Sequence, residues 1–277
     1  MRLLTRFLFF VFLFAQTLLA TESLETLAHK ALEHKTVSTI QWQGKKVWIK
    51  GVAADKSTRV YCWKRQLLYY IAPLDVLKPT PTCGLDQLNL EKRRLIEFHE
   101  RGVPAPQIVG HGGEWLALSD VGQNLHTYLA KQSPAQQTVL IQKALTALIS
   151  LHQKNAVHGR GMIKDFAYDP KTQTMSFIDL SEDPLSWMTL DQAKARDFMM
   201  FLFSVKSFSE LGDNFLKGLF DQYCAQSSEG VRQEIQRTYK FLKPFYKVAD
   251  FFYAYIGVDG QRFCLLMGDL GQFLKKE

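Results

Sequence analysis

Cysteine is scarce in this 277-residue sequence, and its spacing excludes two common classes of small protein. No two cysteines form a C-x-x-C pair, so the sequence indicates neither a zinc site nor a dense disulfide framework. We therefore predict buried thiols, while one long-range disulfide remains open if the domain is exported. The cysteines are Cys62, Cys83, Cys224 and Cys264.

Long basic runs are also missing, although the formal net charge is +7. The Lys and Arg residues are scattered and no nucleic-acid-binding motif accompanies them, so we expect no nucleic-acid partner. An anionic lipid or a phosphorylated ligand fits the charge better, and a role in solubility alone is the alternative. The absence of a Gly-x-Ser-x-Gly elbow argues against a serine hydrolase.

Hydrophobic residues make up 47% of the chain and charged residues 22%, which is typical of a globular protein that can bury a core. The length leaves room for one large domain or two small lobes, together with a terminal extension.

Residues 1–20 predict a signal or membrane-anchor segment. Arg2 and Arg6 precede an uncharged run of fourteen residues from Phe7 to Ala20, short of the roughly 20 residues that a full span needs. Leu18 stands where a cleavage site has a small residue, which disfavours cleavage. We expect association with a bacterial inner membrane through residues 7–20, and a buried helix of the fold is the alternative.

The side of the membrane stays open at this point. The positive-inside rule would place whatever follows a true span outside the cytoplasm. A domain that uses ATP would instead need the cytoplasmic side.

The body of the chain predicts an α+β fold of two lobes, because strand patterns come first and helical patterns follow. Residues 21–35 have helical spacing and form a predicted linker helix, with Thr21 or Ser23 as its N-cap. Residues 36–122 form the predicted N-lobe, and residues 123–277 form the mainly helical C-lobe. Within these lobes we predict a hairpin over 37–52, a helix over 88–101, a strand over 114–122, a helix over 138–155, a short strand over 176–180 and a helix over 190–205.

Two aromatic segments are harder to assign. Residues 61–82 are aromatic, basic and interrupted by proline, and they predict neither a clean strand nor a long helix. Residues 241–257 are rich in Phe and predict a helix of the core. Membrane contact is the alternative for both segments, and substrate contact is a further one for the first.

Charged residues recur where predicted strands and helices meet. Lys50 ends the strand V-W-I-K, a setting in which lysine holds phosphate oxygens. Glu91 on the next helix is the predicted partner that would keep Lys50 extended, with Glu97 as its rival.

A second group of charged residues follows the helix that ends near His152. His158, Gly159 and Arg160 form a predicted turn, and Asp165 and Asp179 come on adjacent loops. Two carboxylates so placed are what a Mg²⁺ ion bound to phosphate oxygens requires.

At these residues the sequence resembles the protein-kinase-like superfamily, in particular its bacterial lipopolysaccharide-core kinase branch. The resemblance runs from about Gln41 to about Ser204 and is carried by V-W-I-K, E-K-R-R-L with G-V-P-A-P, L-S-D-V-G, L-H, H-G-R, I-D-L and A-R-D-F. It implies a two-lobed fold that binds ATP and Mg²⁺ between the lobes.

The resemblance also implies roles for individual residues. Lys50 would hold the phosphates and Glu91 would brace it. The backbone of Ser119, Asp120 and Val121 would meet the adenine. Asp165 and Asp179 would bind the metal, and Asp197 would support the catalytic loop.

The sequence departs from the family pattern in two places. Arg160 stands where active kinases have the catalytic aspartate, and no G-x-G-x-x-G loop precedes Lys50. Because arginine cannot accept a proton, two hypotheses follow.

In the first hypothesis, the protein is an atypical ATP-dependent phosphotransferase acting on an envelope glycolipid of the lipopolysaccharide type or a related acceptor. Arg160 would then neutralise phosphate, and Asp165, Glu182 or Asp183 would orient the acceptor hydroxyl. In the second, the protein is a membrane-associated pseudokinase that binds nucleotide or a partner without phosphoryl transfer.

Overall fold

The computed structural model describes residues 22–52, 56–208 and 211–275. The apolar segment predicted over residues 1–20 lies outside this part of the chain. Among the helices that are described, none combines the length and the apolar character needed to cross a membrane.

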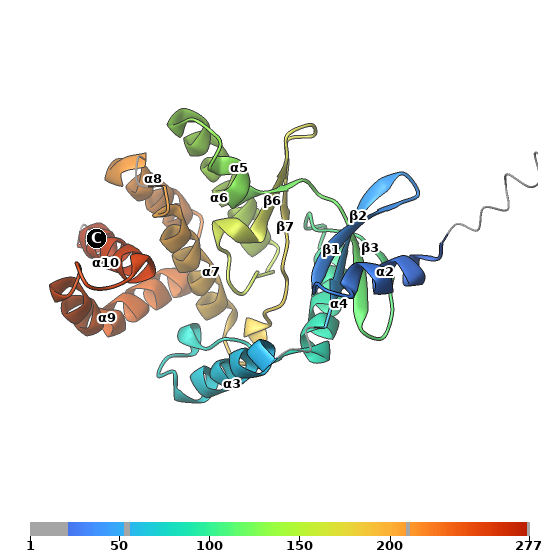
Figure 1. Ribbon diagram of the computed structural model, residues 1–277. Coiled ribbons are helices and arrows are strands. Elements are labelled where there is room, and N and C mark those ends of the chain that lie inside the picture. The colour runs from blue at the N-terminus through green and yellow to red at the C-terminus, as the bar shows by residue number, and fades with distance from the viewer. Residues whose placement is uncertain (1–21, 53–55, 209–210, 276–277) are drawn as a thin grey trace, which may run out of the picture.

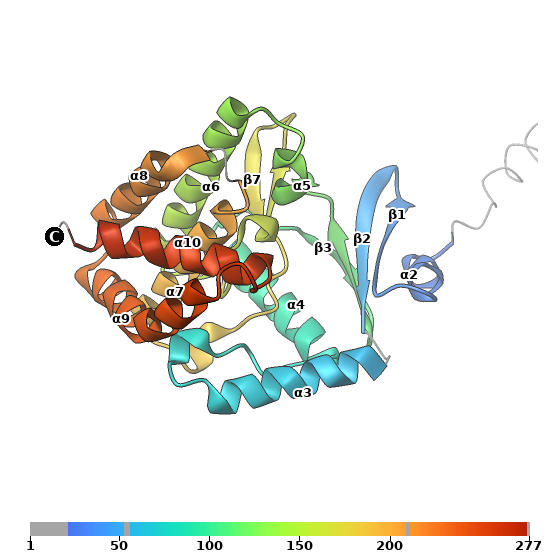
Figure 2. The ribbon, with the colours of Figure 1, turned by 60° about the vertical axis from the view of Figure 1, so that its left-hand side comes forward.

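The N-lobe is built on a four-stranded antiparallel sheet with the strand order β1-β2-β4-β3 (Figures 1 and 2). Its elements are α2 (Leu24–Leu32), β1 (Val37–Trp42), β2 (Lys45–Gly51), α3 (Lys56–Ile71), the 3-10 turn η1 (Asp75–Leu77), α4 (Leu85–Glu100), β3 (Ile108–His111) and β4 (Trp115–Ser119). The predicted hairpin is confirmed, and Gln43 and Gly44, both with positive φ, form its two-residue turn.

Helix α2 covers one face of this sheet. Ser23 caps it, as predicted, by accepting a hydrogen bond from the backbone N–H of Thr26 at 3.1 Å. Val47 and Ile49 of β2 pack beneath α2 in a small core with Ala28. Because side chains alternate along a strand, Trp48 and Lys50 point to the opposite face, toward the C-lobe.

The C-lobe is mainly helical and carries a three-stranded antiparallel sheet of order β5-β6-β7 near the junction of the lobes. Its elements are β5 (Gln123–Asn124), α5 (Leu125–Leu129), α6 (Pro134–Gln153), η2 (Ile163–Asp165), β6 (Phe166–Asp169), β7 (Thr174–Phe177), η3 (Pro184–Ser186), α7 (Leu190–Val205), α8 (Gly212–Ala225), α9 (Glu229–Phe251) and α10 (Val258–Phe273). The predicted α+β, two-lobed fold is therefore confirmed.

One hydrophobic core joins the two lobes. Leu95 and Phe98 of α4 and Leu118 of β4 belong to the same buried cluster as Phe166 of β6 and Phe201 of α7. Helix α4 is therefore packed against the C-lobe as well as against its own sheet.

The prediction that residues 61–82 contain no long helix is wrong, because α3 occupies much of this segment. In Figures 1 and 2, α3 lies along the edge of the molecule between the sheet and the helices of the C-lobe. Its buried side chain is a charged one, Arg65, whereas Trp63, Tyr70 and Ile71 are exposed. A helix with this pattern has no apolar inner face, so the usual helical period is missing.

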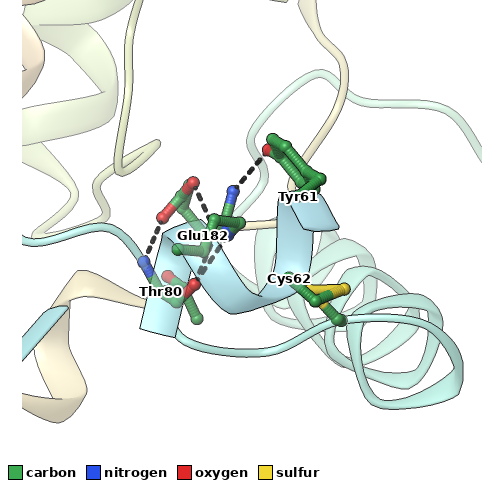
Figure 3. The surroundings of a disulfide bond; sticks show 6 residues. Tyr61, Cys62, Thr80 and Glu182 are labelled. Atoms are coloured by element: carbon green, nitrogen blue, oxygen red, sulfur yellow. Dashed lines mark hydrogen bonds and ion pairs between the residues drawn. A yellow bond between two sulfur atoms is a disulfide. The ribbon is translucent and has the colours of Figure 1, made fainter. Parts of the chain in front are cut away.

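The prediction of buried thiols is wrong for two of the cysteines, and for these two the alternative of one disulfide is confirmed. Cys62 of α3 and Cys83, just before α4, form a disulfide bond (Figure 3). Cys224 and Cys264 are buried, as predicted. The disulfide closes the segment between α3 and α4 into a loop attached to the N-lobe.

The Phe-rich segment 241–257 is helical over its first part, as predicted, but much of it is not core. Phe245, Phe251 and Tyr255 are exposed at the end of α9 and in the turn that follows it.

Candidate functional site: a cleft between the lobes

Lys50 lies at the centre of the junction between the lobes. Its Nζ is 2.6 Å from Oε1 of Glu91 and 2.5 Å from Oδ1 of Asp179. The three residues come from β2, α4 and the loop after β7. The structure thus brings together three residues that are far apart in the sequence and were all predicted for one site.

The charges in this group hold one another ionised. Burial lowers the pKa of Lys50, but Glu91 and Asp179 outweigh that effect and raise the pKa well above its ordinary value. Burial also raises the pKa of Asp179, yet the attraction of Lys50 is stronger and the net shift is downward. Lys50 is therefore a cation and Asp179 an anion at neutral pH.

Asp179 has a backbone conformation that is rare for a residue with a side chain, since its φ is 59°. Nearly half of its side chain, 47%, is exposed to the cleft. Strain of this kind is found at functional sites, where the surrounding structure holds it in place.

Glu91 is the partner of Lys50, whereas its predicted rival, Glu97, forms ion pairs with Arg94 and Arg101 on the same helix. Helix α4 is attached to the C-lobe by several arginines. Arg94 donates to the buried backbone carbonyl of Val157, and Arg101 donates to the carbonyl oxygens of Lys154 and Asn155. Arg93 reaches Asp183 at 2.7 Å. These bonds fix the position of Glu91.

Two cavities meet at Lys50 and Asp179. The larger, about 460 Å³, lies between the sheet and the C-lobe and has an apolar lining that includes Trp48, Leu118 and Ile178. The smaller, about 320 Å³, lies next to the N-terminal part of α4 and is lined in part by Arg160. Lys50, Glu91 and Asp179 line both cavities.

The segment that joins the lobes borders the larger cavity. Ser119 is fixed in the sheet, since its N–H donates to the carbonyl of Gln107 and its Oγ accepts from the N–H of that residue. Asp120 accepts hydrogen bonds from Trp48 at 2.7 Å and Lys46 at 3.2 Å, which ties the segment to β2. Ser119, Val121 and Gly122 line the cavity, whereas Asp120 is not among its lining residues. The role of Asp120's side chain was not foreseen from the sequence.

Asp197 of α7 supports the turn at residues 158–161. It is fully buried and accepts hydrogen bonds from the backbone N–H groups of His158 and Gly159 at 2.5 and 2.7 Å. Burial raises its pKa, but His152 and these N–H donors outweigh burial and lower the pKa below its ordinary value. His158 donates from Nε2 to the carbonyl of Ile178 at 2.8 Å, which links the turn to the residue before Asp179.

Arg160 points from this turn to Asp165. Its Nε and Nη2 donate to the two carboxylate oxygens of Asp165 at 2.9 and 2.5 Å. The N–H of Met162 also donates to Asp165 at 3.1 Å, and Asp165 is fully buried. Each oxygen of Asp165 is therefore already bonded to the guanidinium group.

The predicted magnesium ligands, Asp165 and Asp179, do not fit a shared metal site in this arrangement. A bidentate guanidinium occupies the oxygens that a cation would need, and its positive charge repels a second cation. Across the described ranges, no cluster of three or more His, Cys, Asp or Glu side chains could hold a metal.

The other carboxylates predicted to orient an acceptor hydroxyl are also in ion pairs. Glu182 is buried and bonded to Arg65 and to the N–H of Thr80 (Figure 3). Burial raises its pKa, but Arg196 and Arg65 outweigh burial, so the pKa lies below its ordinary value. Asp183 is bonded to Arg93. None of these groups has a carboxylate that is both unpaired and directed at the cleft.

The topology and the cleft define a protein-kinase-like fold, in which a lysine on β2, a glutamate on α4 and an aspartate after β7 meet between the lobes. No protein-family model matches the sequence. A protein from Haemophilus influenzae, described as uncharacterized, is 26% identical over 222 residues, which cover 76% of this chain and 81% of the relative.

Three solved structures of kinases and phosphotransferases resemble the chain in part. They are the Cydia pomonella granulovirus kinase PK-1 (15% identity, TM-score 0.28, 52% of this chain and 46% of the kinase), the bifunctional kinase-methyltransferase WbdD (16%, 0.37, 76% and 48%) and an aminoglycoside-3'-phosphotransferase of type VIII (14%, 0.35, 84% and 88%). The chain spans about half the length of the first two. Because the TM-scores are only 0.28 to 0.37, the fold rests on the chain's own topology and cleft.

Proposed function

We propose that the cleft binds ATP and that the protein is an atypical ATP-dependent phosphotransferase whose acceptor is an alcohol group of an anionic envelope glycolipid. The observation that carries this proposal is the position of Lys50, between Glu91 and Asp179 where two cavities meet. A cation held between two carboxylates is placed to contact phosphate oxygens without a change of its own conformation.

The two cavities suit the two parts of such a reaction. The larger one has the apolar lining that a nucleobase requires, and Ser119 and Val121 of the joining segment border it. The smaller one would receive the acceptor beside Arg160. Phosphoryl transfer depends mainly on positioning and charge stabilisation, so a missing catalytic aspartate reduces the rate without excluding the reaction.

The acceptor is proposed from charge. The chain carries a formal charge of +7, and the partly exposed Arg160 borders the smaller cavity, where Glu91 and Asp179 balance Lys50. An anionic glycolipid, or the membrane surface that contains it, would be attracted to this part of the protein.

We also propose that the domain is attached to the inner membrane through residues 7–20 and lies outside the cytoplasm. The Cys62–Cys83 disulfide supports export, because disulfides form and persist in oxidising compartments. Export would separate the cleft from the cytoplasmic ATP pool, so transfer by an exported domain would require ATP supplied outside the cytoplasm, and without that supply the second candidate below holds. A phosphatase-type reporter fused after residue 275 is expected to be active outside the cytoplasm, and activity only in a cytoplasmic reporter would contradict the proposal.

The second candidate is a pseudokinase that binds nucleotide without transfer. It is favoured by one observation, namely that Asp165, Glu182 and Asp183 are all paired with arginines. No carboxylate of this group is available to accept the acceptor's proton.

Nucleotide binding is tested with the full-length protein in detergent by calorimetric titration with ATP. Lys50→Ala should weaken binding on the order of ten- to a hundredfold, the usual loss for a charge-assisted hydrogen bond. Lys217→Ala removes a lysine from an exposed ion pair on α8 and is the matched control. A folded native protein that binds no ATP would contradict both candidates.

Transfer is tested with labelled ATP and an extract of the native envelope. The phosphotransferase candidate predicts label in a glycolipid fraction, and Asp179→Ala should abolish it. Binding of ATP without transfer to any acceptor would favour the pseudokinase. Transfer that is unchanged in Asp179→Ala would show that the reaction does not use this cleft.

A further inference from the structure

Asp165 is paired with Arg160 at the edge of the cleft, and its carboxylate is bonded to neighbouring residues of the same turn. Arg160 donates two parallel hydrogen bonds to the carboxylate, and the N–H of Met162 adds a third. The backbone also fixes Asp165, since its N–H donates to the carbonyl of Met162 and its carbonyl accepts from the N–H of Ile178. A buried carboxylate with this many donors is fully satisfied.

Arg160 itself is not enclosed. Its side chain is 24% exposed, and it lines the smaller cavity together with Lys50 and Asp179. Its Nε and Nη2 contact Asp165, so the rest of the guanidinium can contact an anion in that cavity. One planar group can thus bind a buried carboxylate on one edge and a phosphate on another.

We propose that the Arg160 guanidinium takes the place of a divalent cation that Asp165 would otherwise help to hold, so that the phosphate site carries one of its positive charges as a side chain. A cation in a kinase-like cleft neutralises phosphate oxygens and bridges them to the protein. Arg160 does both, through its position between Asp165 and the cavity.

The consequence is a smaller dependence on metal. Of the two predicted metal ligands, Asp179 remains directed at the cleft, and it is already 2.5 Å from Lys50, which Glu91 also contacts. A divalent cation approaching both aspartates would meet the charge of Arg160 first. Replacing Arg160 with a neutral side chain should therefore create a metal site where the native protein has none.

The first test uses Mn²⁺ alone, measured by its electron paramagnetic resonance signal with the full-length protein in detergent. Arg160→Gln retains an amide that can donate to Asp165, and it should bind Mn²⁺ at least about tenfold more tightly than the native protein, because a nearby positive charge is removed. Adding Asp165→Asn to Arg160→Gln should abolish the gain. The matched control is Arg262→Ala, which removes a partly exposed arginine from α10 and should bind like the native protein.

Arg160→Gln could unfold, because it leaves a buried carboxylate without its counter-ion. In that event Arg160→Lys is the second variant. It keeps the charge but cannot form the bidentate pair, and it should fold without gaining the Mn²⁺ site. Equal Mn²⁺ affinity in the native protein and in a folded Arg160→Gln would overturn the proposal, and so would a gain of the site in Arg160→Lys.

The second test rests on the proposed function, since it measures ATP binding with Mg²⁺ and with a chelator. The factor by which Mg²⁺ improves ATP affinity should be larger in Arg160→Gln than in the native protein, by on the order of tenfold. The same factor in both proteins would refute the inference and leave the proposed function intact. Absence of ATP binding by the native protein would refute the proposed function, and the Mn²⁺ measurement would then decide the inference alone.

Discussion

The Cys62–Cys83 disulfide offers a quantitative test of the N-lobe, with Cys62→Ser combined with Cys83→Ser as the perturbation. The sequence separation of the two residues is 21. In the chain-entropy account, a loop of that length restricts the unfolded state by about 3 kcal/mol. For a chain of this size, each kcal/mol lowers the melting temperature by roughly 2–4 °C, so the double variant should melt roughly 6–12 °C lower.

Differential scanning calorimetry measures the effect, with and without a reductant. The native protein should lose stability when it is reduced, and it should then melt at the same temperature as the variant without reductant, because the variant has no disulfide bond. The variant itself should not respond to the reductant, because Cys224 and Cys264 are not bonded to each other.

The disulfide also has a local effect that can be separated from the global one. Arg65, one turn after Cys62, donates to the carbonyl of Thr80 and to Glu182 (Figure 3). Hydrogen exchange of the backbone at residues 80–83 and 181–184 should therefore increase in the variant. If the melting temperature and the hydrogen-exchange rates of the native protein are the same with and without reductant, the assignment of this disulfide bond is refuted.

Three further predictions concern packing, backbone conformation and pH. Phe201→Ala removes a fully buried ring from the core that joins the lobes, and should cost about 3–5 kcal/mol in the free energy of unfolding measured with urea. Gly161→Ala should cost more than about 1 kcal/mol in the same assay, because φ is 60° and a Cβ would lie 2.7 Å from the carbonyl oxygen of Asp197. Burial lowers the pKa of His152 below its ordinary 6.5 and outweighs the opposing effect of Asp197, so the unfolded chain binds a proton that the folded protein excludes. The contribution of His152 to the free energy of unfolding should be complete above pH 6.5 and decline as the pH falls from there toward the pKa of His152 in the folded protein. A His152→Gln variant whose free energy of unfolding falls with pH as steeply as that of the native protein would contradict this.

The sequence predicted the parts of the site whose signals are local. Lys50 follows an alternating strand pattern, and Asp179 follows a short apolar strand, so each could be placed on its element. The order of these elements along the chain also limited which glutamate could meet the lysine, although only the structure separates Glu91 from Glu97.

Other features could not be predicted, because their causes are contacts between distant segments. Helix α3 buries an arginine against Glu182, 117 residues away, and leaves its aromatic side chains exposed, so its periodicity carries no helical signal. The pairing of Arg160 with Asp165 was missed for another reason. The two residues are near in sequence, but family resemblance assigned Asp165 to a metal, and only the direction of the arginine side chain shows that its oxygens are occupied.

The anchoring of α4 has a consequence for regulation. A helix that carries the glutamate of such an ion pair could act as a switch only if it could rotate away from the cleft. Here that rotation would withdraw Leu95 and Phe98 from a core shared by both lobes and break the buried bond from Arg94 to the Val157 carbonyl. The loss of this packing and of this hydrogen bond would have to precede the separation of Glu91 from Lys50. We therefore expect the ion pair to form when the chain folds, without an activating signal. We therefore expect control of this protein to act on its synthesis, its location or the access of ligands.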